Sequence, residues 1–285
     1  MVANFKPMTC QRVVQVADNL PSAPRVLAEL QELLQDANNG IDEVARLLRR
    51  DTGLTARVVR IANGIVYNKG DPVASLDEAL GRVGFNEVYL LAGMASLAQL
   101  ASFQPRWYPV SAARLRESSL YTALLMEEFA LSSGENPRVA FTAGLMRSVG
   151  KIALDTTAQR DRAYGQAPPM APEGLLAWEQ QVFGLTNVQV AEAVLRGWRF
   201  PADVHVPVRD HYLRRLAVDP MRLAKCLNLA AGLAEKAGFG LPGETGYWPV
   251  DQNVFATEIG GNAEDLAAVV ARAAARFEKT RAALA

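Results

Sequence analysis

Hydrophobic residues in the first third of the chain recur at helical spacing. Apolar side chains lie three and four positions apart in two runs, Val26, Leu27, Leu30, Leu33, Leu34 and then Ile41, Val44, Leu47, Leu48. This spacing places them on one face of a helix, so we predict amphipathic helices between residues 20 and 102. Ser75 and Glu78 have the S-x-x-E spacing of a helix start, which predicts a helix from residue 76 to about residue 83, ending at Gly84.

The hydrophobic pattern changes in the middle of the chain. Residues 88–101 are apolar almost all round, which is typical of a buried central helix. Two prolines in the segment 103–109 cannot continue a helix, so we place the boundary between two helical lobes there. Helical spacing returns in residues 112–158 and 173–237, and the prolines at 165–172 predict a surface loop between them.

The chain ends in a Gly- and Pro-rich stretch, residues 238–261, followed by an Ala-rich helix that Asn262 can cap. No run of residues has the alternating pattern of a strand, so the predicted fold is all-α. We expect an N-terminal helical lobe at 1–106, a helical bundle at 107–237, and at 238–285 a loop and a helix that packs on the bundle.

An apolar stripe follows one side of the final helix. It consists of Leu266, Val269, Val270, Ala273 and Phe277. Packing against the chain's own bundle is the expected use of this stripe, and self-association is the alternative.

The composition narrows the classes of partner. Half of the 285 residues are hydrophobic, and 30 basic residues balance 30 acidic ones. A net charge of zero provides no global attraction to nucleic acid or to anionic lipid. No apolar run approaches the roughly 18 to 20 residues of a membrane-spanning helix, and the start has no signal-peptide core, so we expect a cytoplasmic protein without membrane insertion. Two cysteines, Cys10 and Cys226, are too few for a disulfide framework or a thiolate zinc site.

A series of short motifs extends over residues 20–235. In chain order they are Leu20-Pro21-Ser-Ala-Pro24, Asp51-Thr-Gly-Leu54, Arg60-Ile-Ala-Asn63, Ser75-Leu76 with Glu78-Ala79, Arg82-Val-Gly84, Ala143-Gly-Leu145, Gly150-Lys151, Glu179, Phe183-Gly184, Gly197-Trp198, Phe200-Pro201 and His211. Their order and approximate spacing resemble the HDOD family. The resemblance implies an all-α, HD-like helical bundle preceded by an N-terminal helical lobe, in a bacterial signalling setting.

The related HD phosphohydrolases hold a metal with histidines and aspartates, and the metal polarises a phosphoryl oxygen and activates water. The resemblance places Arg147 and Ser148 where that family has its paired His-Asp. An arginine has no lone pair to give a metal. His211 keeps a family histidine. Three further ligand positions are changed, and they are Ser118, Asn187 and Ala231.

Counting residues leads to the same expectation. The only histidines, His205 and His211, are six positions apart, which is about 120° around a continuous helix, so they do not share a face. We therefore expect no cofactor, no metal and no metal-dependent phosphohydrolase activity. A phosphohydrolase with a non-standard, carboxylate-only metal site stays as an alternative, although no clustered acidic motif supports it.

DNA binding is the other alternative. Residues 41–63 resemble a helix-turn-helix with local positive charge from Arg46, Arg49, Arg50, Arg57 and Arg60. The second helix, however, also carries four apolar residues whose burial in a core would leave little of the helix free to contact DNA. They are Leu54, Val58, Val59 and Ile61. A protein partner is therefore expected ahead of nucleic acid.

Arg147 and Lys151 suggest a different use of the altered site. They lie one helical turn apart, and a guanidinium can bind phosphate or carboxylate through two hydrogen bonds without activating water. The pocket could then bind an anionic ligand. The alternative is that Arg147 pairs with an internal acid such as Glu179 or Asp210, or points into solvent.

Trp107 and Trp248 lie in proline-containing segments and are the tryptophans we expect to be exposed. If exposed, they are candidates for an interface. Taken together, the sequence predicts a non-catalytic signalling or regulatory protein that binds a protein partner or a small ligand.

Overall fold

Helices are the only regular structure in the described part of the computed structural model. That part comprises residues 7–18, 23–33, 40–64, 67, 70–100, 104–161, 170, 174–213, 219–248 and 257–284. The all-α prediction is confirmed. No helix in these ranges is both long and apolar enough to cross a membrane.

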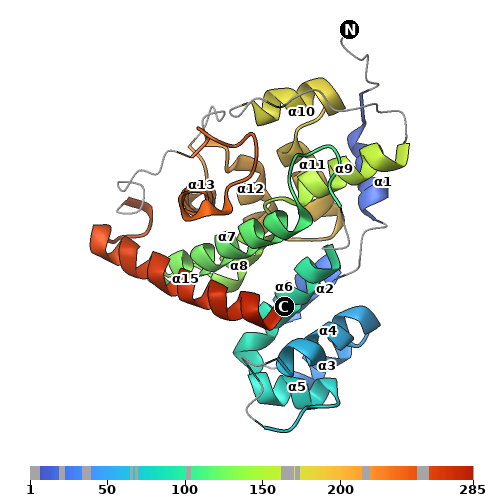
Figure 1. Ribbon diagram of the computed structural model, residues 1–285, viewed down its shortest axis with the longest axis vertical. Coiled ribbons are helices and arrows are strands. Elements are labelled where there is room, and N and C mark those ends of the chain that lie inside the picture. Colours follow the sequence, from blue (N-terminus) through green and yellow to red (C-terminus); the bar gives the residue numbers. More distant parts are fainter. Residues whose placement is uncertain are drawn as a thin grey trace. The chain divides into compact units, whose positions relative to one another are not determined.

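The chain forms two compact units (Figure 1). We call residues 21–102 with 274–285 the small unit, and residues 1–20 with 103–273 the bundle unit. The expected first lobe differs from the small unit at both ends of the chain. Residues 1–20 belong to the bundle unit, and the last part of the final helix belongs to the small unit.

The small unit contains five helices in its described residues before the last helix. They are α2 (Ala23–Leu33), α3 (Ile41–Leu48), α4 (Thr52–Ala62), α5 (Leu76–Val83) and α6 (Phe85–Leu100). Local chemistry sets their ends. The Asp51 carboxylate accepts from the Leu54 backbone N–H at 2.8 Å to start α4, and the Ser75 hydroxyl accepts from the Glu78 N–H at 3.2 Å to start α5. Gly84, at a φ of 83°, ends α5 where the sequence predicted.

The bundle unit is built around α7 (Ala112–Ser133), which packs on α8 (Pro137–Met146) and α13 (Arg222–Ala234). The other helices are α1 (Cys10–Ala17), α9 (Val149–Asp161), α10 (Leu175–Phe183), α11 (Asn187–Gly197), α12 (Ala202–Asp210), the π-helix η2 (Glu235–Phe239) and α15 (Ala263–Leu284). Helix α1 joins this unit because its buried Val13 and Val16 lie on the side that packs against α9 and α11.

The final helix divides its apolar stripe between the units. Leu266, Val269 and Ala273 are buried in the part that belongs to the bundle unit. Phe277, in the part that belongs to the small unit, is also buried, and in the same part the Lys279 ammonium lies 5.5 Å from the centre of the Tyr67 ring. Residues 274–285 are thus grouped with the small unit and residues 263–273 with the bundle unit.

Two glycines let helices of the bundle approach closely. A Cβ atom on Gly144 of α8 would lie 2.6 Å from the Ala123 Cα of α7. A Cβ atom on Gly150 of α9 would lie 1.8 Å from the Asn187 carbonyl oxygen at the start of α11. Neither neighbour is a flexible side-chain end, so the absence of a side chain fixes both helix contacts.

We expect Gly150→Ala to lower the free energy of unfolding by about 3 kcal/mol, because a methyl group forces α9 away from α11. Chemical denaturation followed by circular dichroism measures the change. Gly197→Ala is the matched control on α11, since its Cβ would meet only the Val14 side chain, at 3.6 Å. Equal stability of the two variants would contradict this account of the α9–α11 contact.

Candidate functional site

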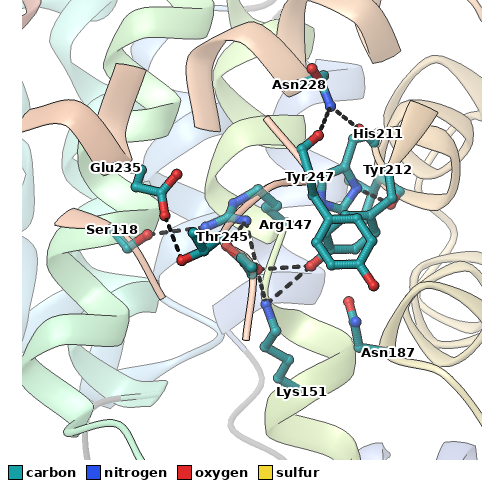
Figure 2. A network of polar contacts seen from close by, with 12 residues as sticks. Ser118, Arg147, Lys151, Asn187, His211, Tyr212, Asn228, Glu235, Thr245 and Tyr247 are labelled. Carbon is teal, nitrogen blue, oxygen red and sulfur yellow. Dashed lines mark hydrogen bonds and ion pairs between the residues drawn. The ribbon is translucent and has the colours of Figure 1, made fainter. Parts of the chain in front are cut away.

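Three of the positions that the resemblance aligned with metal ligands lie at helix ends in the bundle unit. Arg147 follows the last residue of α8, Asn187 is the first residue of α11, and His211 follows α12. Ser118 lies within α7, and Lys151 lies in the first turn of α9. Figure 2 shows these side chains around one buried region.

Arg147 is buried, with 1% of its side chain exposed, and it binds the carboxylate of Glu244. Its Nη1 atom donates to Glu244 Oε1 at 3.0 Å and to Oε2 at 2.9 Å. Its Nη2 atom donates to the Ser118 hydroxyl at 3.1 Å. The guanidinium also lies over the Trp248 ring, 5.5 Å from its centre. Arg147 is therefore held by charge, hydrogen bonds and an aromatic face.

Lys151 binds the same carboxylate. Its ammonium donates to Glu244 Oε1 and, at 3.3 Å, to the Tyr212 hydroxyl, which in turn donates to Glu244 Oε1 at 2.8 Å. The Lys151 and Glu244 side chains are 3% and 1% exposed. One buried carboxylate thus accepts hydrogen bonds from two cationic side chains and a phenol, which stabilises its charge in a place where water cannot.

The electrostatics of this cluster follow from its burial and its charges. Burial raises the pKa of Glu244, but Arg147 and Lys151 together lower it by more, so that the pKa is about 2. Burial lowers the pKa of Lys151, and Glu244 partly offsets this. Burial lowers the pKa of Arg147, but Glu244, Tyr212 and Glu235 together raise it by more. Glu244 is therefore a carboxylate at neutral pH.

Glu244 is carried by residues 241–248, which we call the Glu244 segment. Leu241 and Trp248 are buried at its two ends. Its backbone accepts two hydrogen bonds from the bundle, from the Leu175 N–H to the Gly243 oxygen at 3.2 Å and from the Asn228 side chain to the Tyr247 oxygen at 3.1 Å. Gly243 has a φ of 80°, a conformation that a side chain would strain.

His211 is buried and neutral. Its Nδ1 atom lies 2.7 Å from the Val208 carbonyl oxygen, so Nδ1 carries the proton and Nε2 the lone pair. The ring stacks on Trp248, with 5.6 Å between the ring centres. Burial and the charge of Arg147 lower the pKa of His211 to about 3. Its Nε2 atom has no hydrogen-bond partner in the described residues.

Asn187 belongs to a second buried cluster, centred on Glu179. The Asn187 backbone N–H donates to Glu179 Oε2 at 2.7 Å, its Nδ2 donates to Oε1 at 3.0 Å, and the Tyr108 hydroxyl donates to Oε1 at 2.7 Å. Burial raises the pKa of Glu179 to about 7, although Lys151 and these hydrogen bonds lower it. The side chain that replaces a ligand here orients another residue of the protein.

The last two altered positions contribute little chemistry. Ser148 is buried, and its hydroxyl has no hydrogen-bond partner among the described residues. Ala231 is buried on α13 and has no polar atom in its side chain.

These residues do not match a metal of the HD type. Of the six positions that the resemblance aligned with HD ligands, only His211 offers a strong ligand atom for a transition metal, and the Arg147 guanidinium places positive charge beside it. The ranges that the structure describes contain no group of three or more His, Cys, Asp or Glu side chains in a metal-binding arrangement. The donor set and the charge therefore both oppose the binding of a divalent cation.

The structure brings Arg147 and Lys151 together, as the sequence suggested, but around an acid that the sequence analysis missed. Arg147 pairs with Glu244 and not with Glu179 or Asp210, and Asp210 binds Arg209 at 2.7 Å. Glu244 is 97 positions from Arg147 and lies in a Gly- and Pro-rich stretch. Neither hydrophobic period nor a motif marks it, so no sequence signal could have singled it out.

The expectation that two tryptophans are exposed is wrong. Trp107 and Trp248 are each 7% exposed. Trp107 lies edge-on against Phe183, at 6.0 Å between ring centres, and its backbone N–H donates to the buried Asp155 at 2.8 Å. Trp248 covers His211 and Arg147. The condition for their proposed interface role is therefore not met in this structure.

The helix-turn-helix-like segment packs as expected for a core element. Leu54, Val58 and Ile61 are buried on α4, and Val59 is partly buried. Three of its arginines form surface ion pairs with acids of the small unit, and the pairs are Arg46 with Glu43, Arg49 with Asp77, and Arg50 with Glu29. These acids offset the local positive charge that favoured DNA.

Solved structures of similar fold come from several bacteria. An HDOD domain protein of unknown function from Geobacter sulfurreducens shares 21% identity, with a TM-score of 0.65, and the match covers 97% of this chain and 98% of that one. A proposed metal-dependent phosphohydrolase from Shewanella amazonensis SB2B shares 18% identity, with a TM-score of 0.61 and 95% of both chains covered.

A proposed signal transduction protein from Marinobacter aquaeolei VT8 shares 19% identity, with a TM-score of 0.71; the match covers 99% of this chain and 62% of that one. No curated protein matches the chain. The HDOD domain matches residues 20–213, which is more than half of the sequence. The chain therefore belongs to the HDOD domain family.

Proposed function

We propose that this protein is a non-catalytic member of the HDOD family that acts in signalling by binding a partner. The observation that carries the proposal is the Arg147–Glu244 pair, because it fills the position of the paired His-Asp with a cation and a bound carboxylate. A metal-activated water needs a site that attracts a cation and has an open coordination position. Arg147 and Lys151 are basic and would repel a metal cation, and both donate hydrogen bonds to Glu244.

The signalling setting is supported by the family and by the name of the Marinobacter aquaeolei relative. The phosphohydrolase alternative is supported by the name of the Shewanella amazonensis relative. The chemistry of the site favours the proposal over this alternative. The polar residues of this site bind one another, and the site has only one strong metal-ligand atom, His211 Nε2, which has no hydrogen-bond partner in the described residues. Such a site suits a protein that acts by binding a partner.

We expect the purified protein to carry no stoichiometric transition metal and to hydrolyse neither bis(p-nitrophenyl) phosphate nor cyclic dinucleotides with added Mg²⁺, Mn²⁺ or Ni²⁺. Mass spectrometry of the metal content and a chromogenic assay measure both. Any residual hydrolysis should be the same in His211→Ala, which marks it as a contaminant. About one metal per chain, with activity that chelation and His211→Ala both remove, would establish the phosphohydrolase instead.

The buried histidine also predicts how stability depends on pH. The pKa of His211 is about 3 in the folded protein and 6.5 when exposed, so its contribution to stability is present above pH 6.5 and is lost as the pH falls through that window. Glu179 has the opposite slope, because its raised pKa of about 7 makes its contribution fall as the pH rises from 4.5.

A histidine variant isolates the first effect. The difference in free energy of unfolding between wild type and His211→Phe should shrink by about 1.4 kcal/mol per pH unit between pH 6.5 and 4.5. Urea denaturation at several pH values measures it. His205→Phe is the matched control, because His205 is partly exposed and should change the slope little. Parallel curves for wild type and His211→Phe would show that the buried imidazole does not titrate as described.

A further inference from the structure

Two basic side chains share one acceptor group in the buried cluster. Arg147 and Lys151 both face the single carboxylate of Glu244. His211 is neutral. Glu179 interacts with Lys151 as well. A phosphoryl group offers three acceptor oxygens to the donors of Arg147 and Lys151, whereas the Glu244 carboxylate offers two.

The hydrogen-bonding capacity of Arg147 is also incompletely used. Both carboxylate oxygens of Glu244 lie on the same nitrogen, Nη1, instead of spanning two nitrogens as in a fork. The buried Nε–H of Arg147 has no partner in the described residues, and neither has the hydroxyl of the adjacent Ser148. Unpaired buried donors are costly, and a group with three acceptor oxygens could take them up.

The carboxylate that fills the site comes from a connecting segment and not from a bundle helix. The Glu244 segment has no helical hydrogen-bond ladder, and it is held by two buried end residues and by hydrogen bonds from Leu175 and Asn228. Arg147, Lys151 and Ser118, by contrast, are positioned by helices α7, α8 and α9. The backbones that carry these two basic side chains and the hydroxyl would stay in place if the segment moved.

We propose that Glu244 substitutes internally for the phosphoryl group of a small ligand, and that this ligand displaces the Glu244 segment when its phosphoryl group binds Arg147 and Lys151. The proposal deepens the proposed function and rests on it, because the pocket then binds a phosphoryl group without hydrolysing it. Displacement would uncover Leu241 and Trp248 together, and a change in that surface is a signal that a partner protein can detect.

Glu244→Gln is the direct test, because it keeps the shape of the side chain and removes the competing charge. We expect this variant to bind inorganic phosphate about tenfold more tightly than wild type, since the competing internal group no longer occupies the cations. Calorimetry with EDTA present measures the affinity, and a nucleoside monophosphate in a second arm distinguishes a nucleotide from free phosphate. Glu192→Gln, which removes an acid bound to Arg209 in the same unit, should bind as wild type does. Adding Arg147→Met to Glu244→Gln should abolish binding.

A second measurement uses the wild-type protein and does not depend on the folding of the variant. Phosphate should increase amide hydrogen exchange in residues 241–248, and should not do so in Arg147→Met. Absence of phosphate binding in a folded Glu244→Gln protein, or unchanged exchange in wild type at saturating phosphate or nucleotide, would overturn the proposal. Because both measurements are made without metal, their outcome is separate from that of the hydrolysis assay, which alone decides the proposed function.

Discussion

A carboxylate buried with its charge needs compensating charge and hydrogen bonds at close range, and the bundle unit meets this requirement at Glu244. Removal of both basic side chains would leave Glu244 uncompensated in a region from which water is excluded, which costs far more than loss of a surface ion pair. The positions of α8, α9 and the Glu244 segment are therefore interdependent. Arg147 and Lys151 are only four residues apart, so a shift of one helix end changes both contacts.

The same region shows how aromatic packing and charge support each other. Trp248 lies against His211 on one side and under the Arg147 guanidinium on another, so it excludes water from the ion pair and also keeps the imidazole neutral. The neutral ring adds no charge beside the Arg147 guanidinium. A protonated His211 would add a third cation next to a single carboxylate. The protonation state of His211 is thus set by its burial and by the charges around it.

Sequence analysis succeeded where the determining chemistry is local. The bounds of α5 follow from Ser75, Glu78 and Gly84, which act within one helical turn, and the burial of α4 follows from its apolar spacing. It failed where the partner is distant in sequence. The docking of α1 depends on α9 and α11, more than a hundred residues away, and the partner of Arg147 lies in a segment without any periodic pattern. Trp248 was expected to be exposed but is buried, because a proline-containing loop can still fold over a core formed by residues distant in sequence.

The contact at Gly150 bears on what a family motif can report. The space at this position is closed by the carbonyl oxygen of Asn187, so any family member with the same α9–α11 approach requires glycine there, whether or not its neighbours hold a metal. The match at Gly150 is thus information about helix packing. Agreement of a related sequence at this position is evidence that the two helices approach in the same way, and it carries no information about the chemistry of the neighbouring side chains.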